Sequence, residues 1–340
     1  MVTVYDVAQA CGLSIASVSR ALNGQPGVSR ATAERIARIA GELGYQPNEV
    51  ARSLVAKSTQ TIALLVPDIT NPFFPELVKG VQSVADENDL LLLLVDAPKD
   101  ADELRPRLAA LQRKQVDGIL LVASALDGRT EELFGDVPAV LLDRGRSGRH
   151  ATVRVDQEAA GYAATRHLID AGHTRIGHLA GPEVLEVSQD RRAGWARALT
   201  EAGLPVEDRL VLAGDFEEEG GHRAGAQLLD RNPDLTAVFA ANDLSAIGLL
   251  ALCAERGIDV PRDLSVVGLD GIELARYTTP ALTTVAQPIR ELGEAACRSL
   301  LALISGGGPV ADVTLPTRLV AGASVHVVNR DAAVAVGVPR

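Results

Sequence analysis

The stretch TVYDVAQACGLSIASVSRALNG, residues Thr3–Gly24, decides what the first domain of this 340-residue chain is. Its first apolar residues recur at the spacing of one helical face, namely Val4, Val7, Ala8 and Cys11. Thr3 can cap this helix, and Gly12 can adopt the left-handed conformation that ends it. Ser14 can then cap the next helix. The stretch therefore predicts two short helices that meet at a tight turn.

The second of these helices separates into a buried side and an exposed side. We expect the buried side to be Val18, Ala21 and Leu22, and the exposed side to be Ile15, Ala16, Ser17, Ser19 and Arg20. A third helix is expected to begin at Ser29, with inward side chains Ile36, Ile39, Ala40 and Leu43. Two helices joined by a tight turn and supported by a third form the helix-turn-helix plan, whose second helix enters the major groove of DNA.

An ordinary small helical bundle would give the same apolar pattern, and it is the exposed side that favours DNA binding. Small hydroxyls can bond phosphates at close range, Arg20 can make a two-pronged contact to guanine, and Ile15 and Ala16 can press on thymine methyl groups. The charge agrees, because residues 1–60 hold six basic and four acidic groups and so carry +2, while the whole chain carries −11. A phosphate backbone senses this local charge, not the total.

From Thr61 onward the sequence changes to apolar runs of four to seven residues, each followed by a helical pattern. The runs are TIALLVPD, LLLLVDA, VDGILLVA, AVLLDRG, ATVRVD, RIGHLAG, RLVLAGDF, TAVFAAND and LSVVGLDG. Continuous apolar strands predict parallel sheets that are covered on both faces, hence an α/β body. Nine strands are many for one sheet, so we expect two similar lobes, with the chain crossing between them near residues 155, 285 and 320.

In parallel α/β folds, ligands meet the loops at the carboxyl ends of the strands. The residues just after the apolar runs are unusually polar, and they comprise Asp68, Asn71, Asp143, Asp156, Asn242, Asp243 and Asp270. Aromatic residues lie among them, namely Phe73, Phe74 and Phe216. Carboxylates and amides can bond sugar hydroxyls, while aromatic rings can cover the apolar face of a pyranose. The competing interpretation is that an Asp or Asn after a strand only caps the next helix.

The head also resembles a known family. The motifs YDVA (5–8), VSR (18–20), GYQPN (44–48) and ARSL (51–54), with Asn23, are similar to the LacI/GalR family of bacterial repressors. With the motifs of the body, the resemblance covers nearly the whole chain. It implies an α/β protein that has an all-α helix-turn-helix head and a two-lobed body like that of periplasmic sugar-binding proteins, with a ligand cleft between the lobes.

The resemblance assigns contacts to DNA. It implies that Ile15, Ala16 and Arg20 read bases, and that phosphates are held by Thr3, Tyr5, Ser14, Ser17, Ser19, Asn23 and Ser29. After Pro47 a short hinge helix would follow, with Asn48, Ala51, Arg52 and Leu54 at the DNA. So short a helix is marginal alone and is expected to form only against DNA and a partner hinge. The leucine at position 54 would enter the minor groove at a central CG step and kink the duplex.

The expected domains are a head over residues 1–46, a hinge over 47–59 and a body over 60–340. Within the body we expect one lobe from about 60–157 plus 287–318 and the other from about 158–286 plus 319–330. Arg191 lies where sugar-responsive members of the family carry an arginine that contacts the inducer, and Asn242 and Asp270 also match the family pattern. The expected ligand site is Asp68, Phe73, Phe74, Asp143, Arg191, Phe216, Asn242, Asp270 and Gln287.

The class of effector is partly indicated by what the chain lacks. The purine-responsive branch of the family carries polar groups, an arginine among them, at the positions of Leu185 and Val187, and a glycine where Asn242 stands. These departures argue against a purine and favour an uncharged or lightly charged carbohydrate. A nucleoside or a phosphosugar stays open as the alternative.

Other classes of chemistry find no support in the sequence. The three cysteines have no CxxC spacing, the six histidines have no ligand-like spacing, and no Walker, G-x-S-x-G or HExxH motif occurs. We therefore expect no metal, no cofactor and no enzymatic activity, and three buried, reduced cysteines. No signal peptide and no membrane-spanning run is recognised, so we expect a cytoplasmic protein.

The sequence thus predicts a DNA-binding transcriptional regulator, foremost a repressor of a carbohydrate-utilisation operon that a sugar inducer releases. A homodimer would hold a pseudo-palindromic duplex, and the absence of terminal leucine heptads argues against a tail-assembled tetramer. A corepressor-dependent or activating regulator remains the alternative. A periplasmic sugar carrier and a Rossmann-type enzyme are the rivals from other classes.

Overall fold

The computed structural model describes residues 2–45, 58–97, 101–122, 133–143, 150–306 and 308–328. The chain divides into two compact units, Met1–Thr59 and Gln60–Arg340, called here the head and the body. Within the described ranges, no helix has the length and apolar character needed to cross a lipid bilayer.

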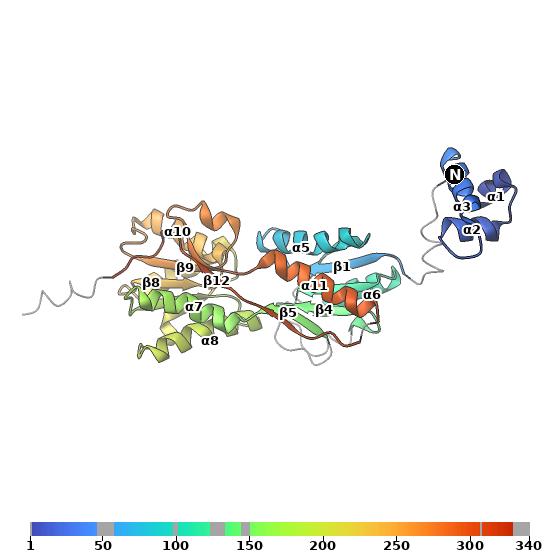
Figure 1. The fold of residues 1–340 in the computed structure, drawn as a ribbon. Helices are drawn as coiled ribbons and strands as arrows, with labels where there is room; N and C mark the ends of the chain where they lie inside the picture. The colour runs from blue at the N-terminus through green and yellow to red at the C-terminus, as the bar shows by residue number, and fades with distance from the viewer. Residues whose placement is uncertain are drawn as a thin grey trace, which may run out of the picture. The chain divides into compact units, whose positions relative to one another are not determined.

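The head consists of three helices, α1 (Val4–Cys11), α2 (Ile15–Leu22) and α3 (Arg30–Glu42) (Figure 1). Their predicted caps are confirmed, because Thr3, Ser14 and Ser29 each accept a hydrogen bond from a backbone N–H in the first turn. Gly12 ends α1 with φ = 63°, a left-handed conformation that glycine adopts without strain. The small core of the head is Val7, Ala8, Cys11, Val18, Ile36 and Ala40.

One inward side chain of the head was predicted wrongly. Leu43 is 39% exposed, because it lies beyond the last residue of α3 as its C-cap and not on the covered length of the helix. Tyr45, two residues further on, packs against the head core instead.

The body contains two six-stranded sheets (Figure 1). The first has the order β11-β5-β4-β3-β1-β2, and its strands are β1 (Thr61–Val66), β2 (Leu91–Asp96), β3 (Gly118–Val122), β4 (Ala139–Leu142), β5 (Ala151–Val155) and β11 (Val313–Leu315). The second has the order β12-β10-β9-β8-β6-β7, and its strands are β6 (Ile176–Ala180), β7 (Val211–Ala213), β8 (Ala237–Ala240), β9 (Ser265–Asp270), β10 (Thr283–Ala286) and β12 (Arg318–Val320). All nine predicted strands are therefore present, as β1 to β9.

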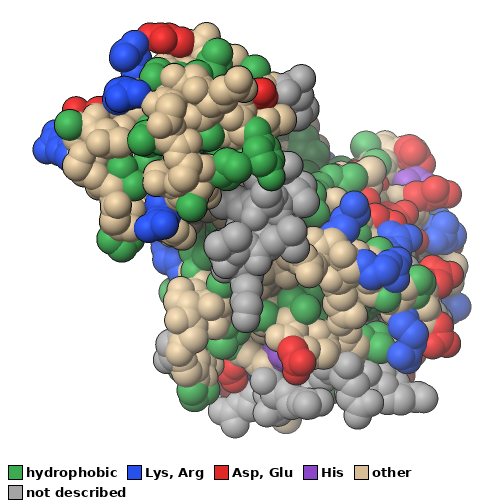
Figure 2. Space-filling view, turned by 90° about the vertical axis from the view of Figure 1, so that its right-hand side faces the viewer, with side chains coloured by type: hydrophobic (Ala, Val, Ile, Leu, Met, Phe, Trp, Pro, Cys, Tyr) green, Lys and Arg blue, Asp and Glu red, His purple; other side chains and the backbone are tan. Residues whose placement is uncertain are grey.

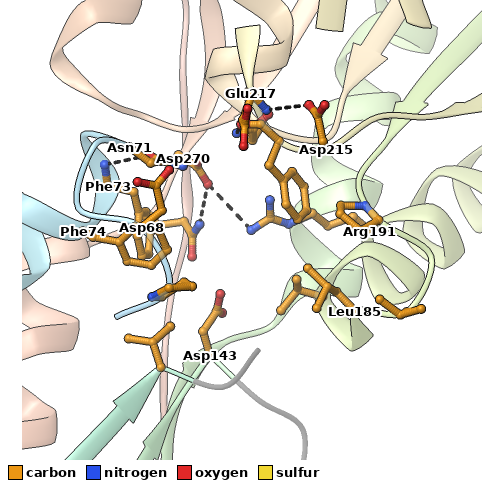
Figure 3. Close-up of a pocket in the computed structure, with 18 residues that line it drawn as sticks. Asp68, Asn71, Phe73, Phe74, Asp143, Leu185, Arg191, Asp215, Glu217 and Asp270 are labelled. Atoms are coloured by element: carbon orange, nitrogen blue, oxygen red, sulfur yellow. Dashed lines mark hydrogen bonds and ion pairs between the residues drawn. The ribbon is translucent and has the colours of Figure 1, made fainter. Parts of the chain in front are cut away.

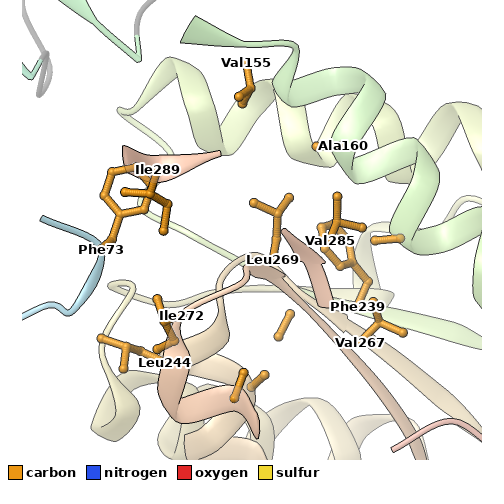
Figure 4. Packing of buried hydrophobic residues seen from close by; sticks show 14 of the residues in the cluster. Phe73, Val155, Ala160, Phe239, Leu244, Val267, Leu269, Ile272, Val285 and Ile289 are labelled. Carbon is orange, nitrogen blue, oxygen red and sulfur yellow. The ribbon is translucent and has the colours of Figure 1, made fainter. Parts of the chain in front are cut away.

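Helices cover the sheets on both faces, as the apolar runs predict. They are α5 (Phe73–Glu87), α6 (Ala101–Arg113), α7 (Gln157–Asp170), α8 (Glu186–Glu201), α9 (Glu218–Arg231), α10 (Asp243–Arg256) and α11 (Ile289–Ile304). In β1, Ile62 and Leu64 pack into the larger core cluster while Ala63 and Leu65 pack into the cluster formed with α6. Figure 4 shows the interior of the larger cluster, where Phe239 of β8, Leu269 of β9 and Val285 of β10 pack together.

The strand β2 departs from the predicted burial. Its run LLLLVD was expected to be covered on both faces, but Leu91 is 61% exposed and Leu94 is 45% exposed. The reason is its position, because β2 pairs only with β1 and forms the open edge of the first sheet.

The chain passes between the two sheets three times. It leaves the first sheet after β5, returns after β10, and crosses again between β11 and β12. These crossings lie where the sequence predicts them. Parallel strands of both sheets end near the first two crossings, so the carboxyl ends of the two sheets face one another across the body.

Three pairs of helices in the body pack through reciprocal glycines. In each pair a Cβ atom on either glycine would overlap the backbone of the facing helix, and the pairs are Gly80 of α5 with Gly293 of α11, Gly161 of α7 with Gly194 of α8, and Gly221 of α9 with Gly248 of α10. The absence of a side chain lets the two backbones approach closely, which fixes the position of the residues beside each contact. One of these neighbours is Arg191, whose carbonyl oxygen lies against Gly161.

Candidate ligand pocket and DNA-binding surface

A cavity of about 270 Å³ lies where the carboxyl ends of the two sheets meet (Figure 3). All nine predicted ligand residues line it. The first sheet and α5 supply Asp68, Phe73, Phe74 and Asp143, the second sheet with α8 supplies Arg191, Phe216, Asn242 and Asp270, and the second crossing supplies Gln287. Their role in binding stays a prediction, but the structure brings residues that are far apart in sequence to one cavity.

Nine further residues that line the cavity are outside the predicted ligand site. They are Pro67, Asn71, Val122, Pro182, Val184, Leu185, Val187, Asp215 and Glu217. Asp215 and Glu217 flank Phe216 just after β7, so the rule that selected the other polar residues also identifies them. The apolar ones carry no chemical signal in the sequence, because such residues occur throughout the core.

Arg191 lies 4% exposed at the centre of a polar network. Its Nε donates to the side-chain oxygen of Gln157 at 2.8 Å, and its Nη1 donates to the carbonyl oxygen of Ala241 at 2.6 Å. Its Nη2 lies 3.7 Å from a carboxylate oxygen of Asp270, the pair joined in Figure 3. The guanidinium also lies over the ring of Phe216, 5.6 Å from its centre.

Three buried carboxyl groups surround this arginine. Burial raises the pKa of Asp270 to about 8, the Arg191 charge opposes the shift, and the charge of Asp243 adds to it. Burial likewise raises the pKa of Asp243 to about 6 and raises that of Asp143. Arg191 only partly compensates Asp270, because its shorter bonds go to neutral oxygens. Asp270 in the lining of the cavity therefore keeps its proton at neutral pH, where an exposed aspartate would be ionised.

Backbone geometry aims three lining residues into the cavity. Asp143, Phe216 and Asp270 have φ values of 52°, 70° and 130°, a region that non-glycine residues seldom occupy. Asp243, behind the cavity, restrains the last of these, because its carboxylate accepts hydrogen bonds from the N–H groups of Gly271 at 2.7 Å and Ile272 at 2.9 Å. Asp243 thus positions Asp270 without lining the cavity.

Helix capping accounts for some of the polar residues after strands. Asp156 accepts a hydrogen bond from the N–H of Ala159 at the start of α7 and does not line the cavity. Asn242 does both, because its side-chain oxygen caps α10 while its amide donates to the carbonyl oxygen of Phe216 at 2.8 Å. The capping interpretation is therefore correct for Asp156 and partly correct for Asn242.

The head presents most of its predicted DNA contacts to solvent. Tyr5 is 66% exposed and Ile15 is 41% exposed, and the other exposed ones are Thr3, Ser14, Ala16, Arg20, Asn23 and Ser29. Ser17 and Ser19 are half-buried. The predicted hinge contacts Asn48, Ala51, Arg52 and Leu54 lie outside the described residues.

The excess negative charge of the body is not gathered on the face that Figure 2 presents. There, basic and acidic side chains lie next to one another. Neighbouring helical residues form many such pairs on the body surface, for example Arg298 with Glu294 at 3.0 Å. All three cysteines are buried and free, as predicted, and no cluster of metal-ligand side chains occurs within the described ranges.

Both the head and the body are similar to known protein families. Residues 3–48 match the family described as bacterial regulatory proteins, lacI family, and residues 165–325 match the periplasmic binding protein-like domain. The chain is 38% identical over 305 residues to the HTH-type transcriptional repressor PurR of Vibrio atlanticus, a match over 88% of this chain and 91% of that one. The ribose operon repressor of Haemophilus influenzae is also 38% identical, with the same two coverages.

Among solved structures, a lac repressor dimer bound to operator and the anti-inducer ONPF superposes with a TM-score of 0.87. It is 29% identical and the match covers 96% of this chain and 99% of that chain. A helix-turn-helix head on a two-lobed body with a central cavity is the organisation of a ligand-responsive, DNA-binding transcriptional regulator. The chain is such a regulator and belongs to the LacI family. The members of this family are regulators of transcription and not enzymes, and they bind operator DNA and small effectors as dimers.

Proposed function

We propose that this regulator represses a carbohydrate-utilisation operon and is released from its operator by a sugar that binds in the cavity. The observation that carries the proposal is the lining, where carboxyl groups and a buried arginine face aromatic rings. Asp143, Asp270 and Arg191 can bond several hydroxyls of one small molecule. Phe74 and Phe216 offer flat apolar surfaces for a sugar ring. The volume of about 270 Å³ lies just below the usual range for ligand pockets, about 300–1,000 Å³, which suits a ligand of one or two sugar rings.

The charge of the lining argues against the phosphosugar alternative. Five acidic side chains line the cavity, namely Asp68, Asp143, Asp215, Glu217 and Asp270. Among the described lining residues Arg191 is the only basic one, and its charge already lies among the buried carboxyl groups of Asp143 and Asp270. A phosphate would meet like charge without a free cation, which costs free energy in a partly buried site. A neutral sugar or nucleoside carries no such cost.

The coupling to DNA would run through the angle between the lobes. Two heads of a homodimer would hold the halves of a pseudo-palindromic operator with a central CG step. The exposed Leu91 and Leu94 on the open edge of β2 suit contact with a second copy. A sugar that binds one interlobe angle better by about 1.4 kcal/mol changes operator affinity tenfold. A protein that reads chromosomal DNA would act in the cytoplasm.

The proposal is tested by ligand screening followed by DNA binding. Thermal unfolding would be followed with D-ribose, D-glucose, D-galactose, cellobiose, inosine and ribose 5-phosphate, and each compound that raises the melting temperature would be added to the protein on a selected operator duplex. A neutral sugar should lower operator affinity at least about tenfold. A compound that tightens operator binding would instead establish the corepressor arrangement, and a response to ribose 5-phosphate alone would contradict the charge argument.

Arg20→Ala should relax the base preference of DNA binding. Loss of a two-pronged guanine contact is expected to cost about 1–3 kcal/mol on the selected operator and little on a random duplex. Fluorescence anisotropy with both duplexes measures the difference. Arg30→Ala is the matched control, because Arg30 is exposed at the start of α3, beside the predicted phosphate contact Ser29. Loss of a positive charge that faces only the DNA backbone should weaken both duplexes equally. Equal losses for Arg20→Ala would show that Arg20 does not read bases.

Asp270→Ala should abolish the sugar response while operator binding in the absence of sugar persists. Loss of the Asp270 carboxyl group would leave a buried sugar hydroxyl without its partner, which costs about 1–3 kcal/mol, so sugar affinity is expected to fall by roughly fivefold to a hundredfold. Titration calorimetry with the best sugar of the panel measures it. Asp208→Ala is the control, because the Asp208 carboxylate is almost fully exposed and pairs with Arg192 on the protein surface. Full induction of the Asp270 variant would remove this residue from the ligand site.

A further inference from the structure

Gln157 lies at the first crossing between the lobes and is only 5% exposed. It is the first residue of α7, directly after β5 has ended at Val155 and Asp156 has capped the helix. It does not line the cavity, and neither its residue type nor its position in the sequence marks it as functional. Its side chain nevertheless bonds both lobes.

The bonds of this amide fix its orientation. Its oxygen accepts from Nε of Arg191, which can only donate, so its NH₂ group faces the other way. That group donates to a carboxylate oxygen of Asp143, and it lies 3.4 Å from the side-chain oxygen of Gln287. Asp143 follows β4 of the first sheet, whereas Arg191 belongs to α8 of the second lobe. One buried side chain thus links the ligand-facing groups of the two lobes.

Gln287 closes the network at the second crossing. It directly follows β10, where the chain returns to the first lobe, and its NH₂ group donates to Asp270 at 2.8 Å. Its backbone N–H donates to the carbonyl oxygen of Asp270 at 2.9 Å. The ring therefore runs from Gln157 to Arg191, on to Asp270, and through Gln287 back to Gln157, while Asp143 is bonded to the ring at Gln157. Two glutamines, one on each crossing, connect three ionisable groups that face the cavity, namely Asp143, Arg191 and Asp270.

We propose that Gln157 is the residue that couples occupancy of the cavity to the angle between the lobes, an inference that rests on the proposed function of the cavity. A hydroxyl that bonds Asp143 or Arg191 uses the same charged groups that hold Gln157, so binding rearranges the amide. Because Gln157 is part of the crossing itself, its rearrangement changes the crossing and with it the relation of the two sheets. Gln157 bonds the ligand-facing groups from outside the cavity and transmits their state to the crossing.

The test separates ligand binding from ligand response in the full chain. In Gln157→Met the cavity keeps Asp143, Arg191 and Asp270, so affinity for the best sugar of the panel should stay within about threefold. The ratio of operator affinities without and with that sugar should fall from about tenfold or more to below about twofold. Gln227→Met is the matched control, because Gln227 is on α9 away from the cavity and its response should be unchanged. Gln157→Glu keeps the acceptor for Arg191 and should also lose the response, through repulsion from Asp143.

Two results would overturn the coupling role. One is a full sugar response in Gln157→Met, and the other is a loss of response in proportion to a loss of sugar affinity, which would make Gln157 a ligand-binding residue only. A readout without any ligand keeps the test decisive if no sugar acts on the wild type. Amide hydrogen exchange at residues 156–160 and 286–290 should quicken at least about tenfold in Gln157→Met, while β8 and β9 keep their protection. Unchanged exchange at both crossings would refute the proposal independently of the effector.

Discussion

Arg191→Met is expected to lower the free energy of unfolding of the body by about 3–5 kcal/mol at pH 8. The substitution keeps much of the side-chain volume but removes the cation that lies among buried carboxyl groups. Breaking a buried ion pair from one side is strongly destabilising, because the remaining charge is left without a partner in a poorly hydrated site. Gln157 and the carbonyl oxygen of Ala241 would also lose their donors.

The loss should depend on pH in a defined direction. The pKa of Asp270 is raised to about 8 and that of Asp243 to about 6, both first of all by burial. The native protein therefore binds protons that the unfolded chain releases above about pH 4, so stability of the wild type falls as pH rises from about 4 to about 8. Protonated carboxyl groups need no cation. At pH 5 the Arg191→Met variant should therefore lose only about 1–2 kcal/mol relative to wild type.

Urea unfolding followed by tryptophan fluorescence measures both quantities. The chain has a single tryptophan, Trp195, which is 1% exposed and lies one turn beyond Arg191 on α8. Arg192→Met is the control, because that side chain pairs with exposed Asp208 at the surface and should cost no more than about 0.5 kcal/mol. Equal losses at pH 5 and pH 8 would mean that the carboxyl groups do not hold the protons assigned to them.

The fold was largely predictable from local signals. Hydroxyl caps, Gly12 and the apolar spacing define the head, and nine apolar runs define β1 to β9. The sequence indicates β10 and β12 only as crossing segments, and it gives no sign of β11, whose three residues are too few for a pattern. The exposure of Leu91 and Leu94 could not be predicted, because a strand at an edge has the same apolar composition as one inside the sheet.

The site residues that follow strands could be predicted from the sequence. The roles of the residues that connect them could not. Asp143 and Asp270 come directly at strand ends, so the rule for parallel sheets selects them. The same rule selects Asp243, but it does not show that this residue acts through the backbone beside Asp270. Gln157 is not selected at all, because contacts between side chains from distant segments leave no trace in a single sequence. The need for glycine at position 161 could not be predicted either, because it comes from the backbone of Arg191 on α8, which lies against Gly161 in the fold.

Gly161→Val should destabilise the body by at least about 3 kcal/mol. A Cβ atom at this position would overlap the carbonyl oxygen of Arg191, and the nearest atoms are backbone, which cannot turn aside as a flexible side chain can. Overpacking a close contact usually costs about 1–3 kcal/mol of stability. A branched side chain between two helix backbones should cost at least as much as the upper limit of that range, because neither backbone can move aside alone. The helices α7 and α8 must separate, and Arg191 moves with α8. Urea unfolding reported by Trp195 would measure the loss.

Gly41→Val provides the comparison, because Gly41 is also a helical glycine and no atom lies within 4 Å of a Cβ built on it. Valine has a somewhat better helix propensity than glycine, so the substitution in the head should change stability by no more than about 0.5 kcal/mol. The separation of α7 and α8 should further lower sugar affinity, although Gly161→Val removes no polar atom from the cavity. If the Gly161 variant matched the Gly41 variant in both stability and sugar affinity, the glycine contact would not hold Arg191 in place.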